Sequence, residues 1–356
     1  MPYPESFSTM VDLISQKLQD TGNSIWTDAE LLLYMTEGLR EISQKSPHIY
    51  MVEFLLESRQ GSATSTSAGN LVDATNSQFV SGDVGKIVYN TKDRTWAYIT
   101  TFTSATTVAL SNDIMASGEG YRIFNKNCNH QKELYLGDMP DWLWIDKIEF
   151  PVMEDLPRYV RWEKRGKNVI RLVTDEEPEN TKNANAKKQV WVYFAMRHKL
   201  SQLTDLSAVT AASAGVAAAA TSMALSGLQA SGTIERGQEF TIANERSRAI
   251  YIVNANASVT ANTASISFFP PIESSAASAT VVTFESTSFP PQLEGIFADL
   301  VSGKAAMHKA RTYINSIGPG PNRYRNMYEW GKLKYDGAKR ELEGLTGFTA
   351  PSATLP

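Results

Sequence analysis

The chain has 356 residues, a formal net charge of −4, 42% hydrophobic residues and 20% charged residues. This composition is ordinary for a globular protein of roughly two or three domains, and the acidic balance argues against a basic nucleic-acid binder. A single cysteine, Cys128, excludes an intramolecular disulfide framework and indicates assembly in a reducing cytoplasm. No cationic N-terminal region precedes an apolar run, and no run approaches the ~20 apolar residues that span a bilayer, so we expect neither signal peptide nor membrane anchor.

The segment 7–47 predicts two short helices joined by a tight loop. Thr27 and Glu30 have the spacing of a capping box, and Trp26 and Leu31 that of a hydrophobic staple. Apolar residues recur at helical spacing on both sides of the loop: Met10, Val11, Leu13, Ile14 and Leu18 before it, and Leu31, Leu32, Met35, Leu39 and Ile42 after it. Such a pair cannot bury both apolar stripes alone, so it needs partner helices from elsewhere in the chain.

Two β-rich segments follow. Residues 49–57 favour a strand, and the small polar stretch 61–70 is typical of a linker. Short β-branched or aromatic runs between residues 71 and 125 predict a small barrel or sandwich, and the runs in 128–200 predict a sheet. Residues 207–222 form a second low-complexity stretch, compatible with helix or with a linker that runs into a strand, and 223–286 predict a second β module.

The chain returns to helix after Pro290 and Pro291, breaks at GPGPN, forms a further helix and ends in an extended tail. The expected fold class is α+β, a discontinuous helical body with a small sheet and two inserted barrel-like or sandwich-like β modules. The expected parts are the helical hairpin at 1–58, β module 1 at 61–126, the body sheet at 127–206, β module 2 at 207–288, the C-terminal helices at 289–345 and the tail at 346–356.

Common enzyme motifs are absent from the sequence: it has no P-loop, nucleotide-binding glycine triplet, zincin motif, EF-hand loop or nucleophile elbow. Cys128 and His130 supply only two of the four ligands of a zinc site, which favours a core thiol beside a surface imidazole. Asp138 and Asp141 flank a proline, where carboxylates more often cap and solvate a turn than catalyse glycoside hydrolysis. We therefore expect no catalytic, metal or cofactor site.

Basic and aromatic residues alternate near the C-terminus and could grip nucleic acid. Because Glu329 and Asp336 are mixed in among them, the pattern favours a solvated helix face or a protein interface. The candidate interface residues are Arg323, Tyr324, Arg325, Tyr328, Trp330 and Phe348.

The hairpin segment LQDTGNSIWTDAELLLYMTEGLREIS resembles the N-terminal signature of head-to-tail adaptor (connector) proteins of tailed bacteriophages. In that signature a Gly-containing turn precedes Trp-Thr-Asp and Glu-Leu-Leu, here Trp26, Thr27, Asp28, Glu30 and Leu31. LYLGDMPDWLWIDKIEFPV and VWVYFAMRHKL resemble later strand segments of the family, whereas the two β insertions depart from its minimal plan.

The resemblance implies a structural virion protein that forms a ring of about twelve copies, a dodecamer at the neck. The implied partners are further copies of the chain, the portal protein, a tail or second adaptor (stopper) protein and the major capsid protein. DNA would pass through the lumen without sequence-specific binding, and no membrane is involved. Two alternatives are a tail or capsid decoration protein whose β modules bind host glycan or other virion proteins and, more distantly, a virion-associated glycan hydrolase.

Overall fold

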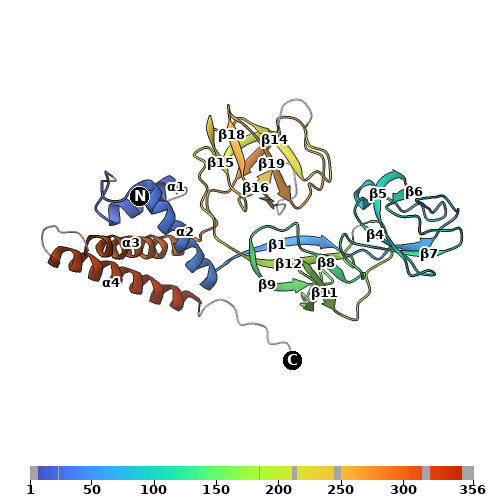
Figure 1. Ribbon diagram of the computed structural model, residues 1–356, viewed down its shortest axis with the longest axis horizontal. Coiled ribbons are helices and arrows are strands. Elements are labelled where there is room, and N and C mark those ends of the chain that lie inside the picture. Colours follow the sequence, from blue (N-terminus) through green and yellow to red (C-terminus); the bar gives the residue numbers. More distant parts are fainter. Residues whose placement is uncertain are drawn as a thin grey trace. The chain divides into compact units, whose positions relative to one another are not determined.

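The computed structural model describes residues 7–22, 24–183, 185–210, 215–243, 250–314 and 321–346. The fold is mixed α+β, with N-terminal helices packed against two C-terminal helices and four antiparallel sheets, including two half-barrels, inserted between (Figure 1). The predicted fold class is confirmed. The chain divides into two compact units, a first unit of Met1–Ile49, Pro140–Trp144 and Ala195–Pro356 and a second unit of Tyr50–Met139 and Ile145–Phe194.

Four helices make up the helical body, which belongs to the first unit. They are α1 (Phe7–Lys17), α2 (Asp28–Lys45), α3 (Pro291–Ile314) and α4 (Pro321–Thr346). One hydrophobic core joins them, and it includes Ile14 of α1, Leu31 of α2, Phe297 of α3 and Leu342 of α4. The partner helices that the N-terminal stripes require therefore come from the far end of the chain.

The turn between α1 and α2 is fixed by side-chain caps. The Glu30 amide donates to Thr27 Oγ1 at 3.3 Å, and the Thr27 amide donates to Glu30 Oε2 at 3.0 Å, which is the predicted capping box. The Asp20 carboxylate accepts from the amides of Ser24 at 3.0 Å and Trp26 at 2.9 Å. Burial opposes its ionisation, but these hydrogen bonds prevail and lower the pKa of Asp20 to about 2.

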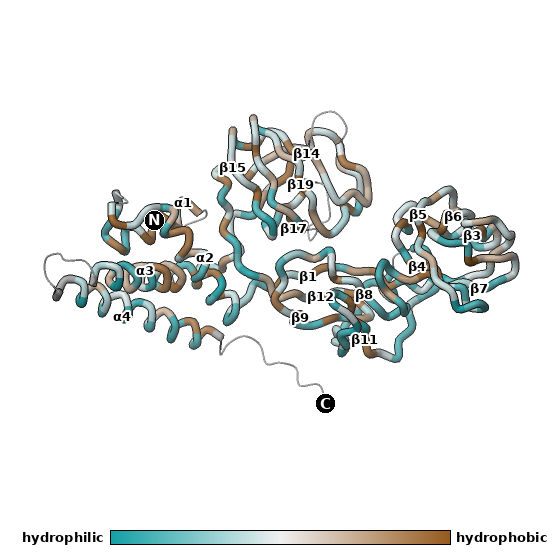
Figure 2. Tube along the Cα trace, in the orientation of Figure 1, coloured by the Kyte–Doolittle hydropathy of each residue, from teal (hydrophilic) through white to brown (hydrophobic). Residues whose placement is uncertain are grey.

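Helix α3 is the common partner of the other helices, and glycines let two of them approach it closely. A Cβ added to Gly38 of α2 would lie 2.9 Å from Val301 Cγ2. A Cβ on Gly303 of α3 would lie 2.6 Å from the carbonyl oxygen of Gly331 in α4. Figure 2 shows α3 as more apolar along its length than α4, as expected for a helix that neighbours cover on several sides.

Two three-stranded sheets belong mostly to the second unit. The first has the order β1-β12-β9, and the second β10-β11-β8. Their strands are β1 (His48–Leu55), β8 (Glu133–Tyr135), β9 (Trp142–Glu149), β10 (Arg161–Lys164), β11 (Val169–Val173) and β12 (Gln189–Met196). Strand β1 confirms the strand expected at 49–57, and β10 and β11 form an antiparallel pair within the region where the sequence predicts a sheet.

The first half-barrel, in the second unit, has the strand order β2-β7-β4-β5-β6-β3. Its strands are β2 (Gln60–Ser62), β3 (Asn70–Val72), β4 (Ile87–Asn90), β5 (Trp96–Ser104), β6 (Thr107–Leu110) and β7 (Gly120–Phe124), with a short 3₁₀ helix, η1 (Ser81–Asp83). The linker predicted at 61–70 is wrong, because the stretch belongs to the half-barrel: β2 covers Gly61 and Ser62, β3 begins at Asn70, and Ala63 is buried in the core. Small polar residues that indicate a linker also form the short loop between two strands of one module.

The second half-barrel, in the first unit, has the order β14-β13-β20-β16-β17-β19-β18-β15. Its strands are β13 (Ser207–Thr210), β14 (Ser222–Ser226), β15 (Ser231–Ile234), β16 (Glu239–Ile242), β17 (Ile250–Val253), β18 (Ala257–Thr260), β19 (Thr263–Phe269) and β20 (Val281–Phe284). Phe240 and Phe268 meet edge to face in its core, with ring centroids 5.4 Å apart. Strand β13 shows that the low-complexity stretch at 207–222 begins as a strand.

The glycine contact between α3 and α4 generates a prediction. Gly303→Ala and Gly331→Ala should each lower the free energy of unfolding by about 1–3 kcal/mol, because the added methyl group overlaps backbone atoms. Gly295→Ala and Gly337→Ala are matched controls, since a Cβ at either helical position meets nothing within 4 Å. Each control should raise stability by about 0.5–1 kcal/mol. Urea unfolding followed by circular dichroism measures all four, and equal effects at all positions would contradict the close approach.

Candidate functional site

Apart from Phe348, the predicted interface residues lie on α4, and Tyr324 and Tyr328 contact α3. The rings of Tyr324 and Tyr313 stack with centroids 5.2 Å apart, and the Arg311 guanidinium lies 5.6 Å from the centre of the Tyr328 ring. Arg325 forms an exposed ion pair with Glu329 at 2.9 Å on its own helix. Tyr324 and Tyr328 therefore contribute to the packing of α4 against α3.

The remaining interface residues differ in position. Trp330 packs against the hydrophobic core of the helical body. The Arg323 side chain and all of Phe348 lie outside the described residues. Leu333, which the sequence analysis did not select, is 71% exposed on α4. The exposure of Leu333 becomes evident only when the partners of α4 are known, because its helical spacing is the same as that of leucines in the core.

The signature residues of the hairpin have structural positions. Trp26 is 3% exposed, and its indole N–H donates to the Ala305 carbonyl of α3 at 3.4 Å. Leu31 is fully buried in the same core, while Asp28 and Glu30 lie in the first turn of α2, where carboxylates interact favourably with the helix dipole. Together with Thr27 of the capping box, these residues shape the helical body rather than form a reactive site.

Ion pairs reinforce the contacts of α3 with both ends of the chain. Lys304 lies 2.8 Å from both Glu37 and Glu41 of α2, and the Tyr335 hydroxyl of α4 donates to Glu41 at 2.9 Å. Partial burial disfavours the charged amine, but hydrogen bonds to the two glutamates raise the pKa of Lys304 above its usual range. Asp299 of α3 likewise pairs with Lys17 of α1 and Lys334 of α4.

The residues considered for chemistry include Cys128, Asp138 and Asp141, and each has its own structural surroundings. Cys128 is fully buried, and burial together with the nearby Glu133 raises the pKa of its thiol to about 12, so the thiolate is scarce. Asp138 lies 3.8 Å from Lys126, and Asp141 lies 3.5 Å from Arg236. Within the described residues no group of three or more His, Cys, Asp or Glu side chains is placed to hold a metal ion.

A cavity of about 450 Å³ adjoins the start of α3 and the second half-barrel. One wall holds His48, whose Nε2 lies 2.9 Å from Glu239. Another holds His198, whose ring stacks on Phe289 and whose Nε2 lies 2.8 Å from the Ser46 carbonyl. Burial lowers the pKa of His198 to about 4, so this imidazole is neutral near pH 7 and links the end of α2 to the segment before α3.

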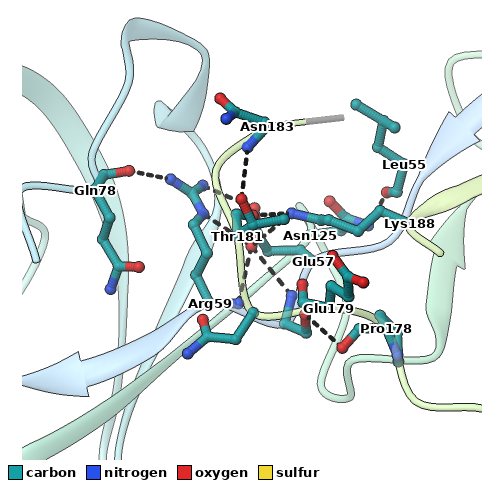
Figure 3. Close-up of polar contacts among 12 residues, drawn as sticks. Leu55, Glu57, Arg59, Gln78, Asn125, Pro178, Glu179, Thr181, Asn183 and Lys188 are labelled. Atoms are coloured by element: carbon teal, nitrogen blue, oxygen red, sulfur yellow. Dashed lines mark hydrogen bonds and ion pairs between the residues drawn. The ribbon is translucent and has the colours of Figure 1, made fainter. Parts of the chain in front are cut away.

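The most deeply buried charged cluster lies in the second unit, where β1 leads into the first half-barrel. Arg59 is 1% exposed, and its guanidinium donates to Glu57 at 2.7 Å and 3.0 Å and to Asp83 at 3.0 Å. Figure 3 shows the guanidinium aimed also at the Gln78 carbonyl, 2.6 Å away, with Lys188 approaching Glu57 from the opposite side. Lys86 pairs with both carboxylates.

This cluster holds neighbouring segments of the chain together and does not form a reactive site. Burial would raise the pKa of Glu57 and Asp83, but hydrogen bonds from Arg59 and the nearby cations hold the pKa of both well below the usual range. The Lys188 amine also donates to the Thr181 carbonyl, so the cluster fastens the loop before β12 (Figure 3). Its members come from three separate stretches of the sequence, with Glu57 in the first, Asp83 in the second and Lys188 in the third, and no local motif indicates them.

Comparisons with known proteins add no relative: no family model, no curated protein and no solved structure matches the chain. None of the helices in the described part of the chain has both the length and the apolar content to cross a membrane.

The charged cluster predicts a pH-dependent stability. Glu57 and Asp83 have lowered pKa values in the folded state, so their contribution is complete above pH ~5 and is lost as the pH falls below ~4. Arg59→Met should cost about 3–5 kcal/mol at pH 7, because it leaves buried carboxylates undercompensated. It should also flatten the rise in stability between pH 3 and pH 5, measured by urea unfolding.

Arg165→Met is the matched control, because Arg165 forms an exposed ion pair with Glu163 at 2.8 Å. It should change stability by no more than about 1 kcal/mol. An unchanged pH profile in the Arg59 variant would contradict the assigned role of the cluster.

Proposed function

We propose that this chain is a structural virion protein, a head-to-tail adaptor whose homo-oligomeric ring bridges the portal to the tail and continues the DNA channel. The observation that supports it best is the α1–α2 hairpin. The residues that resemble the adaptor signature, Trp26, Thr27, Glu30 and Leu31, form the cap and core contacts that fix this hairpin against α3. These residues thus have the spacing of the adaptor signature and also hold the hairpin against α3.

The surface charge of α4 supports the same proposal. Its exposed side carries cations and anions in alternation, including Arg325, Glu329, Lys332 and Arg340. Mixed charges suit the polar rim of a repeated subunit contact. They suit a DNA channel as well, because a strongly basic lumen would retain DNA during ejection.

A second candidate is a tail or capsid decoration protein, and one observation favours it. On the outer face of the first half-barrel, Trp96 is 41% exposed and Tyr98 is 53% exposed, and the Tyr89 ring lies 4.3 Å from the Trp96 ring. Exposed aromatic rings are unusual on a sheet that faces water and fit an apolar sugar face or a partner protein. In an adaptor, the same half-barrel would project outward or touch the capsid or neighbouring subunits.

Negative-stain imaging of the purified chain, alone and with portal, separates the candidates. Rings that stack on portal support the adaptor. Failure to bind portal, together with binding to a host-glycan array that Trp96→Ala abolishes, would favour the decoration protein. Turnover of a cell-wall glycan that Asp138→Asn or Asp141→Asn abolishes would instead favour an enzyme.

The C-terminal segment gives a further prediction. We expect residues 346–356, together with α4, to contact the portal, so deleting them should reduce portal binding and particle assembly. Arg165→Met, an exposed change on a different element, should leave portal binding intact. Binding assays with purified portal measure both, and undiminished binding by the truncated chain would count against the assigned contact.

A further inference from the structure

A groove of about 240 Å³ with a mixed apolar and charged lining lies beside α2 in the first unit. Phe7, Leu32, Met35 and Leu39 form its apolar lining, with Met35 buried at 1% exposure and Leu32 38% exposed. We call it the α2 groove. Its volume is below the ~300–1,000 Å³ of most small-molecule sites, so it suits one or two side chains of a protein partner better.

Three cations line the α2 groove. Arg40, Arg197 and Lys199 line it, and within the described residues none of the three forms an ion pair. The one acid in the lining, Glu235, already accepts a hydrogen bond from the Gln202 amide at 2.8 Å. The groove therefore fits apolar side chains that are accompanied by carboxylates.

The loop between β9 and β10 has this chemistry. Leu156 is 83% exposed, the highest value among the exposed large hydrophobic residues, and Met153 is 59% exposed. Between them lie Glu154, which pairs with Arg158 at 2.7 Å, and Asp155, which forms no ion pair within the described residues. Pro157 restricts the backbone next to Leu156, which lowers the entropy lost when the loop binds.

We propose that the α2 groove binds the Met153–Leu156 segment of a second copy of this chain. Met153 and Leu156 would enter the apolar lining, and the Asp155 carboxylate between them would face Arg40, Arg197 and Lys199. A contact between two different surfaces of one chain is heterologous, which is the kind that closes into rings. The inference rests on the proposed ring, for which it names the subunit contact.

The other highly exposed leucine fits the groove poorly. Leu333 lies between Lys332 and Lys334 in sequence, and its neighbour one turn earlier, Glu329, is already paired with Arg325. Lysines beside the unpaired cations of the groove would repel. Leu333 is thus a matched control, because it is 71% exposed, similar to Leu156.

Cysteine cross-linking between copies tests the contact in the full chain. One chain carries Leu156→Cys and a mass tag, and a second chain carries Leu32→Cys without a tag. The two chains are mixed and oxidised. The native Cys128 is fully buried and does not compete. The proposal predicts a tagged–untagged disulfide dimer, since the two Cα atoms must come within about 7 Å. The control pair, Leu333→Cys with Leu32→Cys, should yield no dimer above background.

The possible outcomes test the α2 groove contact and the adaptor function independently. Rings on portal without the cross-link would overturn the contact and leave the adaptor standing. The cross-link without rings on portal would overturn the adaptor and retain the contact. A disulfide within one chain, in a variant carrying both Leu156→Cys and Leu32→Cys, would show that the groove binds its own loop and would overturn the second copy as its occupant.

A further variant measures the strength of the contact. Leu156→Ala should weaken self-association about tenfold to hundredfold, as expected for losing one buried leucine side chain, whereas Leu333→Ala should not. Sedimentation measures both. Because Leu156 is 83% exposed within one chain, unfolding temperatures should stay equal to that of the unaltered protein. Equal weakening by both variants would overturn the proposal.

Discussion

The close packing of α3 against helices from both ends of the chain is the constraint on which the structure depends. The N-terminal hairpin has apolar stripes that it cannot bury alone, and α4 has a largely polar outer side. Gly38 and Gly331 remove the side chains that would otherwise keep α2 and α4 away from α3. The body closes only after α3 and α4 are available, so both ends of the chain depend on one another.

This closure also explains where the ionic contacts lie. Once the helices are close, Lys304 reaches the glutamates of α2, and Asp299 reaches lysines of α1 and α4. Partly buried pairs of this kind favour one relative position of the helices more than they add stability. A body held in this way is a suitable base for subunit contacts, because a rigid surface loses little entropy when it binds.

The sequence predicts what depends on local spacing and misses what depends on long-range contact. The Thr27–Glu30 box and the hairpin are local, and both were predictable. The Gly303–Gly331 approach and the Arg59 cluster were not, because their partners come from separate stretches of the chain that meet only on folding. The linker expected at 61–70 failed for a related reason, since small polar residues are common both in linkers and in short loops between two strands of one module. The groove beside α2 joins residues from the helices to residues after β12, and no periodicity indicates it.

A cryo-electron microscopy map of the particle that contains this protein tests the central claim most directly. The account predicts a ring of helical bodies between portal and tail, coaxial with the DNA channel, with density for two half-barrels in each copy. Density for the chain only on the capsid surface or along the tail, with the portal contacting a different protein, would contradict it.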